Sequence, residues 1–97
     1  MKGALIVGGY YVEPLKRLLK DKGIDLIVHW TGDKTNDVRK MIPRKTLLVL
    51  ILCDFVNHTL ARKVKEEAGR MGLPVFCCRS SMGEVRMKLN HLESVAK

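Results

Sequence analysis

Four short apolar runs, separated by segments long enough to form helices, constrain the fold of this chain most. The runs are ALIVGG (4–9), IDLIVHW (24–30), LLVLILC (47–53) and PVFCC (74–78). Each is nearly continuous instead of alternating, which is the pattern of strands that are buried on both faces of a sheet. We therefore expect four strands of a parallel sheet.

Two of the intervening segments carry strong helical signals. Apolar residues over 12–19 fall on one stripe, with Pro14 suited to a first helical turn and Gly23 to a helix end. A similar stripe over 59–71 is followed by Gly72. Both segments are predicted to be amphipathic helices.

Two further helices are expected from shorter patterns. The segment 33–42 has few apolar residues and ends at Pro43. Later in the chain, Ser81 and Glu84 have the spacing of a capping box, and apolar residues follow at helical intervals, namely Val85, Leu89 and Leu92.

Strand and helix thus alternate along a chain of 97 residues, which is too short for a second core. Crossovers of this length connect parallel strands and place helices on the sheet. We predict one domain over residues 1–97, a small doubly wound α/β fold of the flavodoxin-like kind. The expected strand order is 2-1-3-4, with helices on both faces.

The chemically versatile residues follow the ends of these strands. In an open parallel sheet, ligands bind beyond the carboxyl ends of the strands, where the strand order reverses. A helix start with hydroxyls and an arginine nearby favours an anion. The residues expected to bind a ligand at this edge are Gly8, Gly9, Tyr10, His29, Asp54, His58, Arg79, Ser80 and Ser81.

A metal site is an alternative use of the same edge. Neighbouring strands lie about 4.8 Å apart, so the side chains after strands three and four could meet as ligands: Cys53, Asp54, His58 and Cys77. These groups suit zinc or another transition metal, and the expected cofactor, if there is one, is a metal or a metal-centred group. Their spacing matches no zinc signature, and packing alone is the competing explanation for each cysteine. Cys77 and Cys78 are expected to point to opposite faces.

Three strings, VGG (7–9), HWTGD (29–33) and CDFVNH (53–58), precede GLPVFCCRSS (72–81). With them the chain resembles the bacterial family called domain of unknown function 2325, over residues 3–92. The resemblance implies the fold and a site at Gly8, Gly9, His29, Asp54 and His58. It implies no activity, and no thiol chemistry either, because Thr is common in the family where this chain has Cys53.

We expect a non-enzymatic binding or sensor domain for a small anionic or metal-centred ligand. The alternative is a thiol-dependent enzyme in which Asp54 and His58 assist Cys53, and a thiol pKa below that of free cysteine would favour it. The second alternative is a nucleic-acid-binding accessory protein, suggested by the net charge of +8. Against it stand the absence of a recognised motif and an aromatic content of 5%.

The cellular location and the oligomeric state are predicted from simpler features. No apolar run approaches the roughly 18–20 residues of a membrane-spanning helix, no signal-peptide pattern is visible, and three cysteines are a poor basis for a disulfide framework. We therefore expect a cytoplasmic protein with reduced thiols and no membrane contact. The fourth strand should lie at the sheet edge with unpaired backbone groups, which predicts a homodimer.

Overall fold

The centre of the protein is a four-stranded, fully parallel sheet with the order β2-β1-β3-β4. The structure is a computed structural model that describes residues 2–31, 41–79 and 83–87. The strands are β1 (Gly3–Val7), β2 (Leu26–Trp30), β3 (Thr46–Leu52) and β4 (Val75–Cys78). The predicted fold class and strand order are confirmed.

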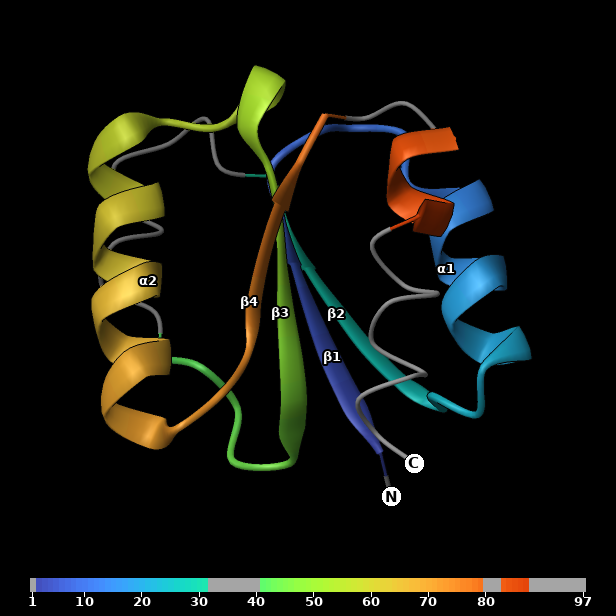
Figure 1. Cartoon of the computed structure of the whole chain (residues 1–97), viewed down its shortest axis with the longest axis horizontal. Helices are drawn as coiled ribbons and strands as arrows, with labels where there is room; N and C mark the ends of the chain where they lie inside the picture. Colours follow the sequence, from blue (N-terminus) through green and yellow to red (C-terminus); the bar gives the residue numbers. More distant parts are fainter. Residues whose placement is uncertain (1, 32–40, 80–82, 88–97) are drawn as a thin grey trace.

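Helices cover both faces of the sheet, as predicted. Helix α1 (Glu13–Asp21) connects β1 to β2 on one face, and α2 (His58–Met71) connects β3 to β4 on the other (Figure 1). Residues 83–87 are also helical and lie on the α1 side. No helix in the described ranges has the length and apolarity needed to span a bilayer.

The ends of α2 are set by residues whose chemistry suits them. The side chain of Asn57 caps the helix, because its Oδ1 accepts hydrogen bonds from the amides of Thr59 at 2.8 Å and Leu60 at 3.4 Å. At the other end Gly72 adopts φ 71°, a left-handed conformation that glycine reaches without a steric penalty. Asn57 and Gly72 therefore fix where α2 begins and ends.

The core consists of two layers, one on each face of the sheet. Alternate residues of β1 divide between them, since Ala4 and Ile6 pack on the α1 side and Leu5 and Val7 on the α2 side. The residues of β3 alternate in the same way: Leu48, Leu50 and Leu52 join the α1 side, and Val49 and Ile51 the α2 side. The two central strands are therefore buried on both faces, which explains their continuous apolar runs.

Two predicted boundaries were wrong for a local reason. The first run was expected to remain a strand to Gly9, but β1 ends at Val7 because Gly8 and Gly9 turn to positive φ. The third was expected to include Cys53, but the chain curls there into the short 3-10 turn η2 (Cys53–Phe55). Both strands therefore stop just before the residues of the candidate site.

The two helices predicted from shorter patterns are only partly described. Most of the segment 33–42 lies outside the described residues, and its last two positions, Met41 and Ile42, are not helical. For the last helix, residues 83–87 are helical and Val85 is buried, whereas Ser81, Leu89 and Leu92 lie outside the described part. The carboxylate of Glu84 accepts a hydrogen bond from the Arg79 amide at 3.1 Å.

Strand β4 lies at the sheet edge, and the homodimer remains a prediction from that position. An unpaired edge favours pairing with a second chain, so light scattering at micromolar concentration should give twice the 11.0 kDa of one chain. The substitution Val75→Lys on β4 should abolish the dimer. The matched control Ile27→Lys, on the other edge strand β2, should preserve it. A mass of one chain throughout, in protein that circular dichroism shows to be folded, would contradict pairing through β4.

Candidate functional site

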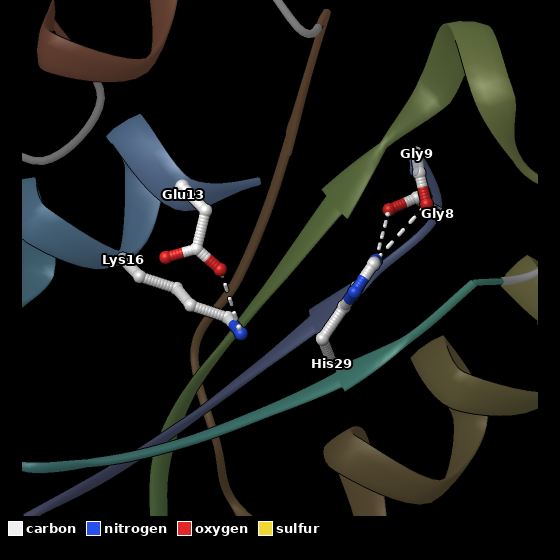
Figure 2. Close-up of polar contacts among 5 residues, drawn as sticks. All are labelled: Gly8, Gly9, Glu13, Lys16 and His29. Atoms are coloured by element: carbon white, nitrogen blue, oxygen red, sulfur yellow. Dashed lines mark hydrogen bonds and ion pairs between the residues drawn. The ribbon is translucent and has the colours of Figure 1, made fainter. Parts of the chain in front are cut away.

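The turn after β1 is held by the imidazole of His29, which comes from β2. His29 Nε2 lies 3.0 Å from the carbonyl oxygen of Gly8 and 3.0 Å from that of Gly9 (Figure 2). Both partners are carbonyl oxygens, which only accept, so Nε2 must carry a hydrogen and donate it to both. The Gly8 amide in turn donates to the Trp30 carbonyl at 2.8 Å. The turn is thus bonded to β2 through its backbone and through a side chain.

Gly8 and Gly9 are required by the shape of this turn. Their φ angles are 99° and 74°, a region that side-chain-bearing residues rarely adopt. A Cβ atom on Gly9 would lie 2.9 Å from Cδ1 of Leu52, the last residue of β3, so the turn also presses against the neighbouring strand. The glycines therefore bring the end of β1 into close contact with the ends of β2 and β3.

Beyond β3 the chain exposes three polar groups at the same edge. Cys53 and Asp54 are exposed within η2, and His58 is exposed as the first residue of α2. The cap of α2 is Asn57, so the His58 imidazole is not used for capping. Within the described part of the chain, the His58 side chain takes part in no hydrogen bond or ion pair, and its imidazole is available at the rim.

The start of α1 differs from the start of α2 in charge. Glu13 lies in the first turn of α1, where its carboxylate interacts favourably with the positive end of the helix dipole. It also forms an ion pair with Lys16 at 3.5 Å (Figure 2). The first turn of α2 has no acidic residue. A bound anion is therefore favoured at the α2 side of the edge over the α1 side.

Two of the three cysteines lie together where β3 and β4 end. The Cys53 thiol donates to the Ile51 carbonyl oxygen, with Sγ 3.7 Å from that oxygen. Partial desolvation of the thiol, and then the neighbouring Cys77 thiol, raise the pKa of Cys53, against the lowering effect of Lys65. The thiol-enzyme alternative needs a lowered thiol pKa, so this feature counts against it.

The prediction for the neighbouring pair Cys77 and Cys78 is confirmed. Cys78 is buried in the core layer on the α1 side, whereas Cys77 packs against the layer on the α2 side. The two thiols therefore point to opposite faces of the sheet, with Cys77 on the α2 side.

The metal site stays a prediction. In the ranges that the structure describes, no three side chains of His, Cys, Asp or Glu gather as a group that could hold a metal ion. All four predicted ligands, Cys53, Asp54, His58 and Cys77, belong to these ranges. Along the chain, the η2 turn and Asn57 separate His58 from Cys53.

The other predicted ligand-binding residues have varied positions. Tyr10 is 68% exposed at the turn after β1, and Arg79 is exposed after β4. Ser80 and Ser81 lie outside the described residues. The Glu84 carboxylate at the Arg79 amide occupies a position where an anion was expected to bind. The anion-binding prediction is therefore better supported beside His58 than beside Arg79.

A pocket that was not predicted from the sequence lies beside the later turns of α2. This pocket of about 540 Å³ is lined among others by Ile42, Arg44, Lys63, Glu67 and Arg70. Glu67 is buried, and its Oε1 accepts a hydrogen bond from the Ile42 amide at 2.8 Å. The sequence signal was a carboxylate on the apolar stripe of a predicted helix, where it needs a buried partner.

Comparison with known proteins adds a family but no characterised relative. The family model described as "Uncharacterized protein conserved in bacteria (DUF2325)" matches residues 3–92. No curated protein and no solved structure matches the chain. The family pattern therefore covers every element of the sheet without naming an activity.

Alanine at Gly9 tests how closely the turn approaches β3, and Gly72 offers a control with nearly the same φ. Gly72→Ala meets no atom within 4 Å and should lower the free energy of unfolding by about 1–2 kcal/mol, through its φ alone. Gly9→Ala adds the overlap with Leu52 and should cost about 1–3 kcal/mol more in urea unfolding. Equal losses would show that the turn does not press on β3.

Proposed function

The chain belongs to the DUF2325 family of uncharacterized bacterial proteins, and we propose that it is a small non-enzymatic ligand-binding or sensor domain. Its ligand is a small anion, held at the carboxyl edge of the sheet between the turn after β1 and the residues that join β3 to α2. This is where the crossovers diverge, since α1 and α2 lie on opposite faces of the sheet (Figure 1).

The observation that carries this proposal is the bond from His29 Nε2 to the carbonyls of Gly8 and Gly9. A strand can end without such a device, but a binding site gains from a backbone whose shape is fixed before the ligand arrives. Here a side chain from one strand fixes the turn of another at the point where the sheet binds ligands in this class of fold. The hydrogen bond from His29 therefore supports a preorganised site.

The anionic character of the ligand is supported on the α2 side of the edge. The positive end of the α2 dipole carries no acidic side chain in its first turn. The exposed His58 imidazole can donate a hydrogen bond there, and the chain has a net charge of +8. A phosphate or carboxylate group would combine these interactions.

Two alternatives from the sequence have less support. The raised pKa of Cys53 opposes nucleophilic catalysis by that thiol at neutral pH. Nucleic-acid binding rests on net charge alone and would be recognised by an affinity that falls steeply with salt. A metal-centred ligand would show as stoichiometric metal in elemental analysis of anaerobically purified protein, and that result would contradict the anionic ligand.

Titration with inorganic phosphate, followed by amide NMR spectra, tests the proposed site. Shifts should concentrate at residues 8–12 and 54–60, around the turn after β1 and the start of α2. His58→Ala should weaken phosphate binding about ten- to a hundredfold, because it removes one hydrogen-bond donor to a charged group.

The control for this titration is Arg70→Ala, which alters the pocket beside the later turns of α2. Under the proposal this variant binds phosphate as tightly as the unmodified protein. If Arg70→Ala weakens binding and His58→Ala does not, the ligand site is the α2 pocket and the proposal for the carboxyl edge is wrong. Absence of any shift at millimolar phosphate would also contradict it.

A further inference from the structure

Two cysteines lie on the same face of the sheet where β3 and β4 end. Ile51 pairs with Cys77, and Leu52 pairs with Cys78. Ile51 packs on the α2 side and Leu52 on the α1 side, so the alternation directs the next residue, Cys53, to the α2 side, where Cys77 also packs. The effect of Cys77 on the pKa of Cys53 agrees with this placement.

The three cysteines differ in access. Cys53 is exposed, Cys77 is half-buried, and Cys78 is 1% exposed on the other face of the sheet. A small reagent in solution therefore meets Cys53 first and finds Cys77 as the adjacent thiol. The positive charge of Lys65 lowers the pKa of Cys53, but desolvation and Cys77 outweigh it and the pKa is raised.

Joining the two sulfurs requires a separation of about 2.05 Å between them, and so a movement of Cys53 toward β4. Cys53 stands in η2, a turn of three residues that contacts β4 and lies outside the hydrogen-bonded sheet. Such a turn can adjust the Cys53 backbone while the paired residues of β3 and β4 stay in place.

We propose that Cys53 and Cys77 form a redox-active dithiol, which a low-molecular-weight disulfide converts reversibly to an intramolecular disulfide. The Cys53 thiolate attacks one sulfur of the reagent, forming a mixed disulfide and releasing one reagent thiolate. Cys77 then loses its proton to solvent and attacks the Cys53 sulfur, which releases the second reagent thiolate. The two protons given up by the cysteines convert the reagent thiolates to thiols, so two cysteines are oxidised and one disulfide is reduced.

The pH dependence of this reaction follows from the environment of Cys53. Its raised pKa keeps the thiol mostly protonated at neutral pH, and only the thiolate attacks. Oxidation is therefore slow at neutral pH and accelerates about tenfold per pH unit until the raised pKa is approached.

The disulfide between Cys53 and Cys77 would change the carboxyl edge of the sheet whether or not that edge binds an anion. The new bond would tie η2, which also carries Asp54, to the outer strand β4. It would restrain the residues that follow β3 while leaving the His29 contact with the turn after β1 unaltered. The dithiol is therefore a candidate redox control of this edge and can be tested separately from the ligand.

The test is incubation of the reduced full chain with oxidised glutathione, followed by alkylation in denaturant and mass spectrometry. One alkylated cysteine, Cys78, should remain, together with a linked peptide pair that contains Cys53 and Cys77, and dithiothreitol should restore all three thiols. Cys78→Ala should form the same link, whereas Cys77→Ser should stop at a glutathione adduct on Cys53.

Three results would overturn the proposal. A link that includes Cys78 would contradict the placement of that thiol on the other face. A link between two chains, identified by doubled mass under non-reducing conditions, would contradict an intramolecular bond. A glutathione adduct on Cys53 that persists in the unmodified chain would show that Cys77 cannot reach it.

Discussion

The hydrogen bond shared between His29 Nε2 and the carbonyls of Gly8 and Gly9 is the constraint on which the candidate site depends. Strand β1 is central, so the chain that leaves it must turn between its two neighbours. Positive φ at both glycines makes that turn, and it directs two carbonyl oxygens to the imidazole. Without this donor, two partly buried acceptors would lose their partner, at a cost of about 1–3 kcal/mol each.

The two sides of the turn after β1 differ in their charged and polar groups. On the α1 side, the Glu13 carboxylate already interacts with the positive end of the helix dipole, and its ion pair with Lys16 is exposed. On the α2 side, Asn57 caps the helix and His58 remains available. The edge is thus asymmetric, with a fixed turn in the middle, a side that favours anions at α2, and a pair of thiols at β4.

The sequence was sufficient for the sheet because burial on both faces requires nearly continuous apolar runs, and helix stops such as Gly72 mark the connections. It was insufficient for the role of His29, which was expected to line the crevice. That role depends on a contact between residues 21 positions apart in the chain, and no local pattern reports it. Likewise, the metal ligands were predicted from the neighbouring ends of strands three and four, but the chain curls into η2 after β3, and the described residues contain no group of three such ligands. The pocket beside α2 was missed because Glu67, a carboxylate on the apolar stripe of a predicted helix, was not singled out.

The protonation of the His29 ring is the most direct test of this account, because both hydrogen bonds require a hydrogen on Nε2. Nitrogen-15 NMR of the imidazole under mildly alkaline conditions, where an ordinary histidine is neutral, distinguishes the two tautomers. The account predicts the tautomer protonated at Nε2, with that hydrogen exchanging slowly with water and coupled through hydrogen bonds to the carbonyls of Gly8 and Gly9. A ring protonated at Nδ1 alone would contradict it, because Nε2 could then donate to neither carbonyl.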